Sequence, residues 1–383
     1  MTPFTFTTVK TVISESGSSA RLGEIAAGLG ITRALIVTDP GIVRFGLLEP
    51  ALASLAKTNI AVTIYSDVVA DPPEAKVLDS LHLARDAGID GVIGLGGGSS
   101  MDVAKVIALL TNSSQSLPEV YGVGNAKGTR LPLIQVPTTA GTGSEVTPIA
   151  IITTGETTKT GIVSPLLYAD VALLDADLTL GLPPAVTAAT GIDAMVHAIE
   201  AYTSKIRKNP YSDVLAREAL RLLAANLVTV VEDGRNREAR QAVLFGAMLA
   251  GQAFANAPVA AVHALAYPLG GHYHISHGLS NSLVLPAVLR FNLPAAAPLY
   301  AELMTVLEPE AAGTEAELAA AFVTAMREQI AAVKLPVRLR DLNVPEADLP
   351  MLARDAMAQQ RLLVNNPREV SEADALAIYR EVY

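Results

Sequence analysis

The sequence predicts an N-terminal α/β domain with a mostly parallel sheet, followed by an all-α C-terminal domain. Up to about residue 184, short apolar runs alternate with helix-like stretches, the pattern of a doubly wound sheet. Beyond that point strand patterns disappear and Ala/Leu-rich stretches dominate. The 383 residues are 50% hydrophobic but only 4% aromatic, and small aliphatic residues suit parallel strands buried between helices. We therefore expect domains at residues 1–184 and 185–383, with a hinge near residues 181–186.

The elements expected in the first domain follow from local patterns. Its strands are short apolar runs, and the opening stretch Met1–Lys10 is expected to be a further strand because Thr alternates with apolar residues there. The other expected strands are Ala34–Thr38, Ile60–Tyr65, Gly91–Leu95, Leu131–Val136 and Val171–Leu174. The stretches with helical periodicity between them are Pro50–Lys57 and Glu74–Ala87.

The elements expected in the second domain are long helices. They are Ala185–Ser204, Ser212–Glu232, Arg235–Ala255 and Thr314–Val333. A further helix-like run, PVAAVHALAY, is expected to end at Pro268, because a proline inside a helix removes a hydrogen bond. The stretch GGHYHIS after it is expected to form a turn.

Composition excludes several classes of function. The net charge of −10, with no run of Lys or Arg, argues against a nucleic-acid partner. Because there is no cysteine, disulfides, thiolate catalysis and cysteine-bound metals are excluded. No stretch of about 18 uninterrupted apolar residues predicts a membrane span. The N-terminus has neither a basic start nor a long apolar run, so a cytoplasmic protein is expected.

A glycine-rich turn follows the strand expected at Gly91–Leu95. The residues Gly96, Gly97, Gly98 and Ser99 lead directly into a helix whose first turns carry Asp102 and Lys105. Glycines permit close backbone approach, and the free N–H groups at a helix start favour a phosphate. The alternative is a tight turn that binds no ligand.

A second loop, Pro137–Thr147, follows another apolar strand and reads PTTAGTGSEVT. Its hydroxyl groups and glycines are suited to hydrogen-bond a ribose, a diphosphate or a nicotinamide, although an ordinary Ser/Thr-rich loop has the same composition. Two such loops after strands of one sheet favour a nucleotide crevice.

Asp39 ends the strand ALIVTD. A carboxylate at a strand end accepts hydrogen bonds from a ribose diol and repels a 2′-phosphate, which favours NAD over NADP. Asp39 precedes the glycine turn, however, so this is not the ordinary Rossmann pattern. Asp39 is equally suited to cap the helix expected at PGIVRFG.

The six histidines are concentrated: four fall within residues 263–277. Asp193 and His197 are spaced i and i+4, so they share one helix face and can reach one cation, or simply hydrogen-bond to each other. Together with His263 and His277 they offer one oxygen and three nitrogen ligands, which suits a catalytic Fe(II) or Zn(II) with positions open for substrate.

Several stretches closely resemble the iron-containing (group III) alcohol dehydrogenases, in the family's order and across essentially the whole chain. They are GLGGGSSMDVAK, PTTAGTGSEVTP, KTGIVSP, DADLTLGLPP, ATGIDAMVHAIEAYTS and HALAYPLGGHYHISHGLSN. The resemblance implies a dehydroquinate-synthase-like fold, with a nucleotide domain, a helical metal-binding domain and the active site in the cleft. It also implies a homodimer or larger homo-oligomer.

The resemblance also implies residue roles. The metal ligands would be Asp193, His197, His263 and His277. The NAD-binding residues would be Gly97, Gly98 and Ser99 at the diphosphate, with Asp102 supporting that loop. Thr138, Thr139 and Thr142 would line the cofactor site, Lys159 would lie near the ribose, and Asp39 would select NAD over NADP. His272 and His274 match no ligand position and are expected near the ligands or in the cleft, whereas His82 is expected to be structural.

Tyr267 departs from the family pattern, because many members carry a histidine at this position in the motif HxxxHP. That histidine lies near the nicotinamide and is not a metal ligand. Tyr267 is therefore expected either to relay a proton through its hydroxyl group or to shape the substrate site.

The expected function is a metal-dependent oxidoreductase that transfers hydride between NAD and a small or medium alcohol or aldehyde. The alternatives are a maleylacetate-type keto-acid reductase and a dehydroquinate-synthase-like lyase. Both take anionic substrates, and residues 255–282 contain no Lys or Arg to bind them. A nucleotide-binding protein without catalysis is the remaining alternative.

Overall fold

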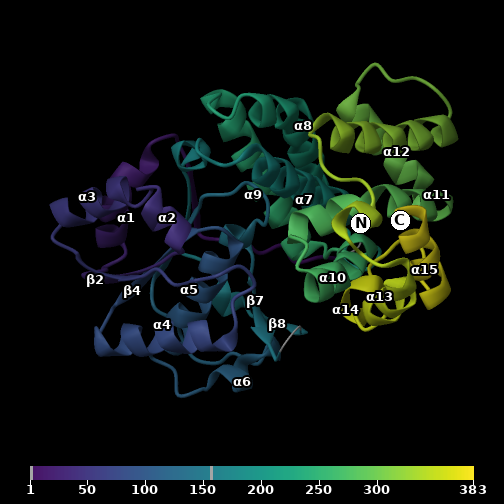
Figure 1. The fold of residues 1–383 in the computed structure, drawn as a ribbon. Helices are drawn as coiled ribbons and strands as arrows, with labels where there is room; N and C mark the ends of the chain where they lie inside the picture. The colour runs from purple at the N-terminus through teal and green to yellow at the C-terminus, as the bar shows by residue number, and fades with distance from the viewer. Residues whose placement is uncertain (1–2, 156–157) are drawn as a thin grey trace. The chain divides into compact units, whose positions relative to one another are not determined.

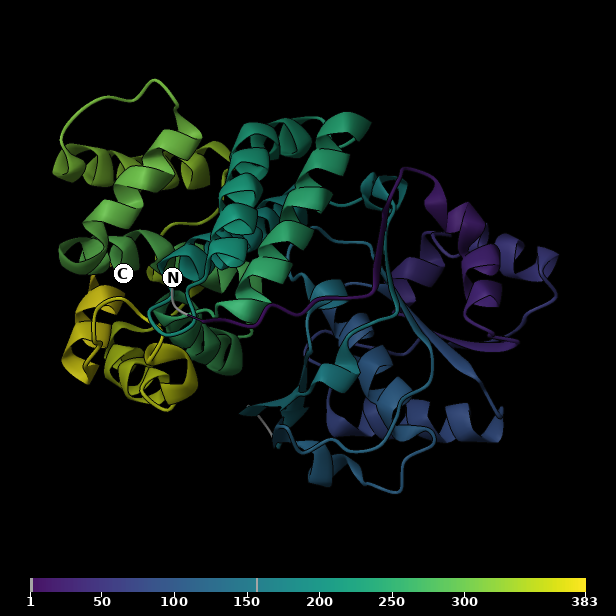
Figure 2. The same cartoon turned by 180° about the vertical axis from the view of Figure 1, so that it is seen from behind.

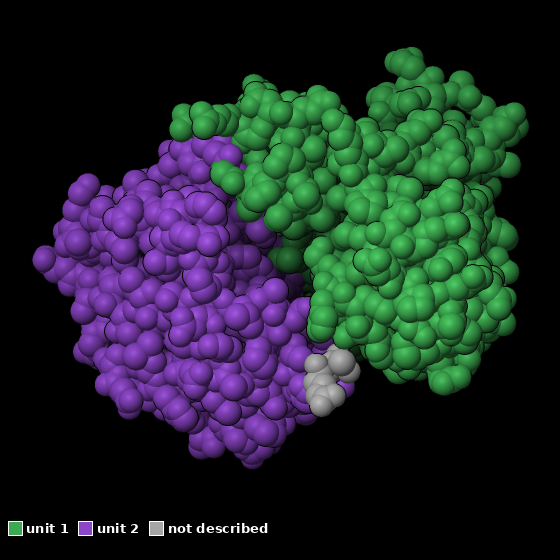
Figure 3. All heavy atoms as spheres, viewed as in Figure 1, with its two compact units in different colours: residues 1–7, 140–142, 181–383 green, residues 8–139, 143–180 purple. Residues whose placement is uncertain are grey.

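The computed structural model describes residues 3–155 and 158–383 (Figure 1). The chain divides into two compact units, coloured separately in Figure 3. The α/β unit consists of residues 8–139 and 143–180, and the helical unit consists of residues 1–7, 140–142 and 181–383.

A six-stranded, entirely parallel sheet forms the centre of the α/β unit. Its order is β1-β9-β6-β4-β2-β3. The strands are β1 (Thr11–Ser14), β2 (Arg33–Val37), β3 (Ala61–Tyr65), β4 (Gly91–Gly96), β6 (Leu133–Pro137) and β9 (Val171–Leu174). The central strands β4, β6 and β9 are buried along their whole length, which explains why they read as continuous apolar runs. The parallel sheet expected from the sequence is confirmed.

Helices cover both faces of this sheet (Figures 1 and 2). One face carries α1 (Leu22–Gly28), α2 (Pro40–Arg44) and α3 (Glu49–Lys57), and the other carries α4 (Glu74–Asp86) and α5 (Gly98–Leu110). The short helix α6 (Leu117–Val120) follows α5 in the chain. Aliphatic side chains of β2, β4, β6 and β9 form one hydrophobic core with those of α1, α2 and α3.

A second, three-stranded sheet was not expected from the sequence. It contains β5 (Gly122–Val123), β8 (Thr158–Val163) and β7 (Ile149–Thr154), with β7 and β8 antiparallel. The described part of this unit also contains four short 3-10 helices. They are η1 (Ser18–Arg21), η2 (Ser144–Val146), η3 (Pro165–Leu167) and η4 (Ala176–Thr179).

The prediction of a strand over Met1–Lys10 is wrong for the residues that the structure describes. No strand is present between Pro3 and Lys10, and the first strand begins at Thr11. The backbone of Thr7 hydrogen-bonds the Asn256 side chain instead, at 2.8 Å through its N–H and 2.9 Å through its carbonyl. These backbone groups are therefore satisfied by a side chain and not by a neighbouring strand.

In the residues that the structure describes, the helical unit contains six long helices and three shorter ones. They are α7 (Pro184–Thr203), α8 (Pro210–Glu232), α9 (Arg237–Asn256), α10 (Ala261–Tyr273), α11 (His277–Leu307), α12 (Glu315–Ala332), α13 (Leu349–Ala356), α14 (Gln360–Leu363) and α15 (Glu372–Glu381), with 3-10 turns η5 (Leu339–Leu342) and η6 (Glu346–Asp348) before α13. Helix α7 packs against α8, α9 and α11 and is buried along most of its length. The helical second domain is confirmed.

Pro268 does not end a helix, contrary to the prediction. Helix α10 begins at Ala261 and continues through Pro268 to Tyr273, so His263 lies in its first turn and not near its end. The expected turn GGHYHIS is helical up to Tyr273, and the left-handed backbone of His274 (φ 54°) ends the helix. Because α10 packs against α11, α13 and α14, tertiary contacts outweigh the one hydrogen bond that Pro268 removes.

Helix α11 is long and apolar enough to cross a membrane by length and composition alone. Half of its most apolar stretch is buried inside the protein, and it packs against α7, α10 and α12. Its apolar length is explained by this packing in the core of the helical unit.

Candidate metal centre

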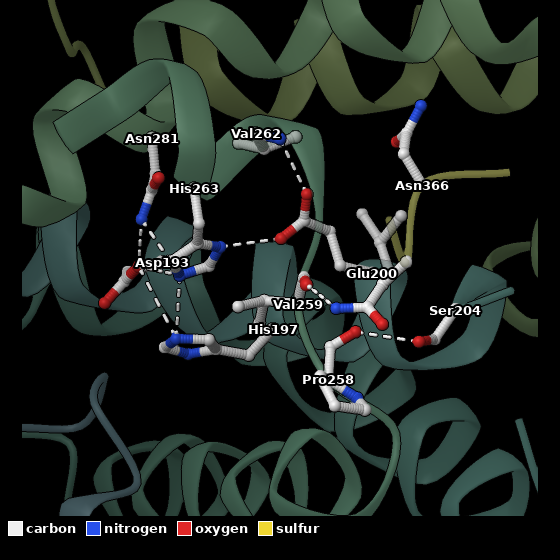
Figure 4. A network of polar contacts seen from close by, with 12 residues as sticks. Asp193, His197, Glu200, Ser204, Pro258, Val259, Val262, His263, Asn281 and Asn366 are labelled. Atoms are coloured by element: carbon white, nitrogen blue, oxygen red, sulfur yellow. Dashed lines mark hydrogen bonds and ion pairs between the residues drawn. The ribbon is translucent and has the colours of Figure 1, made fainter. Parts of the chain in front are cut away.

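Four side chains of the helical unit converge on one point. Asp193 and His197 come from successive turns of α7, His263 from the first turn of α10, and His277 is the first residue of α11. One ligand atom from each lies within 4.8 Å of all the others. Figure 4 shows Asp193, His197 and His263 pointing toward one another. The structure thus brings together the four residues that the sequence proposed as metal ligands.

A glycine allows α11 to approach α7 closely enough for this convergence. A Cβ added at Gly278 would lie 2.3 Å from the carbonyl oxygen of Ala189 and 3.3 Å from the Cβ of Asp193. Any side chain at this position would collide with the α7 backbone. The His-Gly step at residues 277–278 is therefore the local signal for a close helix crossing.

The spacing of the ligand atoms fits a single metal ion. The Asp193 Oδ1 atom lies 4.0, 3.8 and 3.6 Å from the Nε2 atoms of His197, His263 and His277. The Nε2 atoms of His197 and His263 are 3.0 Å apart. Tetrahedral bonds of about 2.0–2.2 Å place ligand atoms roughly 3.4 Å apart, which these separations bracket.

Three of the four side chains in the cluster are buried, and the fourth is partly exposed. The side chains of Asp193, His197 and His263 are at most 5% exposed, whereas that of His277 is 32% exposed. A site that holds a metal and leaves one side accessible is suited to catalysis, because a closed ligand shell excludes substrate.

Burial keeps the two inner imidazoles neutral. It lowers the pKa of His197 and places that of His263 well below its usual value. Burial alone would raise the pKa of Asp193, but the three imidazoles and the Asn281 amide outweigh it and lower that pKa. An ionised carboxylate and neutral imidazoles are the forms that bind a divalent cation.

Both inner histidines are held through their Nδ1 atoms. His197 Nδ1 lies 3.2 Å from the carbonyl oxygen of Gly141, and the His197 ring stacks on Phe254 at 4.3 Å. His263 Nδ1 lies 2.6 Å from Oε2 of Glu200, a contact visible in Figure 4. In each ring the Nε2 atom is left to face the centre of the cluster.

Glu200 was missed by the sequence interpretation. It is buried on α7, and burial raises its pKa to about 7 against the opposing effect of hydrogen bonds from the backbone of Ala260 and Val262. The available signal was its spacing, since Glu200 follows His197 by three residues and Asp193 by seven on the same helix.

Asn281 was also missed. It lies one turn after His277 on α11, and its amide nitrogen donates to Asp193 Oδ1 at 2.6 Å. The same nitrogen is 3.3 Å from the Nε2 atoms of His263 and His277. Asn281 therefore orients the carboxylate of Asp193 toward the imidazoles. Its spacing of four residues from a candidate ligand was the signal available.

The remaining three histidines lie outside this cluster. His272 hydrogen-bonds Asp355 on α13 at 2.7 Å, and His274 is an exposed residue at the end of α10. His82 is exposed on α4.

Tyr267 lies beside the cluster, with its ring centre 5.9 Å from that of His277. Arg361 of α14 lies near the Tyr267 hydroxyl group. Burial raises the pKa of Tyr267, and Arg361 opposes this without reversing it, so the hydroxyl group keeps its proton at neutral pH. Residues 255–282 contain no Lys or Arg, but the packing of α14 against α10 brings Arg361 close from far along the chain.

The glycine turn of the α/β unit lies where β4 ends and α5 begins, with Gly97 at the N-cap. Among the described residues, no side chain caps this helix. The N–H groups at the start of α5, near Gly98 and Ser99, are therefore available to an anion. The side chain of Thr139 lies 3.7 Å from a Cβ built on Gly97, so the second loop borders the turn.

Asp102 connects α5 to the second loop. It accepts hydrogen bonds from Ser144 Oγ at 2.6 Å and from the Ile151 N–H at 2.9 Å. Lys105, fully buried one turn later, donates to Ser144 Oγ and to the Ile149 carbonyl, each at 2.7 Å. This network fixes both loops around the start of α5.

The structure places the other proposed cofactor residues as follows. Asp39 caps α2 by accepting from the N–H groups of Gly41 and Ile42, and its Oδ2 lies 3.4 Å from a Cβ built on Gly96. Lys159 on β8 forms a 2.6 Å ion pair with Asp71. Of the proposed cofactor residues in the second loop, Thr138 is buried just after β6, and Thr142 belongs to the helical unit.

Both the N-terminal and the C-terminal part of the chain match models of known protein families. Residues 10–176 match the family model described as iron-containing alcohol dehydrogenase, and residues 187–383 match the C-terminal model of the Fe-containing alcohol dehydrogenase family. The chain is 41% identical over 362 residues to long-chain-alcohol dehydrogenase 1 of Geobacillus thermodenitrificans, covering 93% of this chain and 90% of that one.

Two solved structures have the same fold over the full length. The crystal structure of a 1,3-propanediol oxidoreductase gives a TM-score of 0.97 with 34% identity, covering 100% of both chains. The sulfoacetaldehyde reductase of Bifidobacterium kashiwanohense in complex with NAD+ gives 0.89 with 28% identity, covering 100% of this chain and 99% of that one.

A nucleotide-type parallel sheet, joined to a helical unit in which one aspartate and three histidines converge, defines a dehydrogenase that uses both a dinucleotide and a metal. The chain is an oxidoreductase, and it belongs to the iron-containing alcohol dehydrogenase family.

Proposed function

We propose that the protein transfers hydride between NAD and a small or medium alcohol or aldehyde, with Asp193, His197, His263 and His277 holding an Fe(II) ion. The observation that carries this proposal is the convergence of these four ligand atoms within 4.8 Å of one another. Zn(II) suits the same ligands, so the family to which the chain belongs is the reason for preferring iron.

The bound metal supplies Lewis acidity to the substrate oxygen, and NAD accepts the hydride. The chain's own residues prepare the site for that chemistry. Neutral imidazoles and the Asp193 carboxylate present lone pairs to one point, and the exposed side of His277 leaves room for substrate. Phe254 covers one face of His197 and keeps water from it.

In the α/β unit, we assign the cofactor diphosphate to the uncapped start of α5 at Gly97, Gly98 and Ser99. Asp39, beside that turn, selects the unphosphorylated ribose of NAD. Thr138, Thr139, Thr142 and Lys159 are assigned to the cofactor by family resemblance alone.

We consider two roles for Tyr267, and removing its hydroxyl group distinguishes them. If Tyr267 relays a proton, Tyr267→Phe lowers kcat and changes its pH profile. If Tyr267 only shapes the substrate site, Tyr267→Phe changes KM between substrates and leaves the pH profile of kcat unchanged.

A second candidate substrate class is a carbonyl compound with an anionic group. Arg361 favours it, because its positive charge lies near Tyr267, whose ring is beside that of His277. Among the similar structures, the sulfoacetaldehyde reductase is named for such a substrate. The lack of Lys and Arg within residues 255–282 therefore does not exclude an anionic substrate.

The test is NADH formation and consumption by metal-stripped protein that is re-supplied anaerobically with Fe(II) or with Zn(II). The substrates are neutral alcohols and aldehydes, and aldehydes of equal length that carry a carboxylate or sulfonate. Metal-dependent turnover would support the function and rank its substrates. No turnover with either class, despite NAD and metal binding, would overturn it.

A further inference from the structure

Glu200 lies on the same face of α7 as two of the proposed ligands, at three residues from His197 and seven from Asp193. Its side chain is 5% exposed, and it belongs neither to the ligand set nor to the cofactor residues. A carboxylate this deeply buried is costly unless its oxygens are hydrogen-bonded. The partners of those oxygens therefore indicate what Glu200 does.

Both oxygens of Glu200 are used by the first turn of α10. Oε1 accepts from the Val262 N–H at 2.7 Å, and Oε2 contacts His263 Nδ1 at 2.6 Å. Figure 4 shows the carboxylate between these two groups. Among the described residues, the N-cap Ala260 offers no side-chain cap to α10, so Glu200 supplies a negative charge at the positive end of that helix.

The contact with His263 has a defined direction. When Glu200 is ionised, its carboxylate only accepts hydrogen bonds, so His263 carries the proton of this contact on Nδ1. The lone pair of that imidazole is then on Nε2, which lies 3.0 Å from His197 Nε2 and 3.8 Å from Asp193 Oδ1. His197 is held differently, by the neutral carbonyl of Gly141 at 3.2 Å.

We infer that Glu200 is a positioning residue for the metal centre, which fixes His263 in the tautomer that offers Nε2 to the ion and balances the ion's charge. This rests on the proposed function, since it presumes that the cluster holds a metal. With both groups ionised, the carboxylates of Asp193 and Glu200 offset the two charges of a divalent ion, and the buried centre is then formally neutral. A carboxylate on Nδ1 also makes the imidazole a stronger ligand than a neutral carbonyl does.

The variant that isolates this role is Glu200→Gln, which keeps the side-chain shape. Its single oxygen can still accept from the Val262 N–H and cap α10. The amide NH2 then faces His263 Nδ1 and, as a donor, favours the tautomer with the proton on Nε2. That proton occupies the direction of the metal. We expect metal affinity to fall by about 10–100-fold, while NAD binding and secondary structure are retained.

The measurements are the metal Kd by chelator competition and the histidine tautomers of the metal-free protein by 15N NMR. The matched control is Glu302→Gln, because Glu302 also accepts a hydrogen bond from an α7 residue, Tyr202, outside the ligand cluster. The control should leave both readouts unchanged. Glu200→Asp, which keeps the charge but shortens the reach, should lose less affinity than Glu200→Gln.

The outcomes separate two failures. If the unsubstituted protein binds no divalent metal, the proposed function fails first. If it binds metal and Glu200→Gln binds as tightly with the same His263 tautomer, the role of Glu200 is overturned. Should Glu200→Gln not fold, the unsubstituted protein still decides, because a metal-free His263 with its proton on Nε2 contradicts the inference.

Discussion

The Nε2 atoms of His197 and His263 lie 3.0 Å apart, although 66 residues separate these histidines in the chain. Their rings are stacked, with centres 4.7 Å apart. Two lone pairs that face each other at this distance repel unless a proton or a cation lies between them. Since burial lowers the pKa of both imidazoles, protonation is disfavoured and a metal ion is the better occupant.

Removing one proposed metal ligand should abolish turnover and leave NAD binding intact. Asp193→Asn keeps the shape of the side chain but loses the charge at the centre of the cluster. We expect metal affinity to fall by more than the roughly 100-fold that loss of a supporting hydrogen bond costs. Metal analysis, turnover and NADH fluorescence titration measure the three quantities. Turnover that persists in metal-free Asp193→Asn would contradict the ligand assignment.

Gly278→Ala should disrupt the crossing of α11 and α7. The added Cβ would lie 2.3 Å from the Ala189 carbonyl oxygen, so one backbone must move. We expect a loss of about 1–3 kcal/mol in unfolding free energy, together with weaker metal binding. Denaturant unfolding and metal titration measure these effects. Gly28→Ala is the control, because nothing lies within 4 Å of its added Cβ, and it should unfold like the unsubstituted protein.

Asp39→Asn should relax the preference for NAD over NADP. Asparagine caps a helix as well as aspartate does, so the hydrogen bonds to Gly41 and Ile42 can be kept while the charge is lost. We expect the ratio of kcat/KM for NAD to that for NADP to fall by about 10-fold, or ~1.4 kcal/mol. An unchanged ratio, with the fold intact, would assign Asp39 to capping alone.

Arg361→Leu separates the two candidate substrate classes. A hydrogen bond to a charged group contributes about 1.5–3 kcal/mol, so loss of Arg361 should lower kcat/KM for carboxylate- or sulfonate-bearing aldehydes by about 10–100-fold. Neutral aldehydes of the same length should change by less than about 3-fold. Equal effects on both kinds of aldehyde would reject the anionic class.

The stability of the α/β unit should decrease in acid through Asp170. Burial alone would raise the pKa of Asp170, but hydrogen bonds from Arg130, Lys10 and the Leu133 N–H lower it to about 2. Because the folded-state pKa lies below the unfolded value of 3.8, the stabilisation is complete above about pH 4 and is lost as the pH falls toward 2.

Asp170→Asn tests this contribution. The variant should lose about 2 kcal/mol of unfolding free energy at pH 7, and the difference should shrink between pH 4 and pH 2. Urea unfolding across this range measures it. A constant difference for Asp170→Asn at every pH would point to packing and not to charge.

Much of the α/β unit could be predicted from local patterns. The apolar runs that became β2, β4, β6 and β9 are bounded by turn residues, and strands that are almost wholly buried need little else to be recognised. The strand prediction for the opening stretch was wrong over the described residues 3–10. The alternation there is typical of a strand, but the backbone of Thr7 hydrogen-bonds the side chain of Asn256. Local alternation cannot show what supplies the hydrogen bonds.

The sequence by itself determined the candidate ligands of the centre, because histidine is scarce in this chain and Asp193 shares a helix face with His197. Only the tertiary structure decided what surrounds them. Glu200 contacts His263 because α7 and α10 both pack against α11, and Arg361 lies near Tyr267 because α14 packs against α10. Side-chain spacing within one helix follows from its 3.6-residue period, but contacts between helices depend on packing across the whole unit.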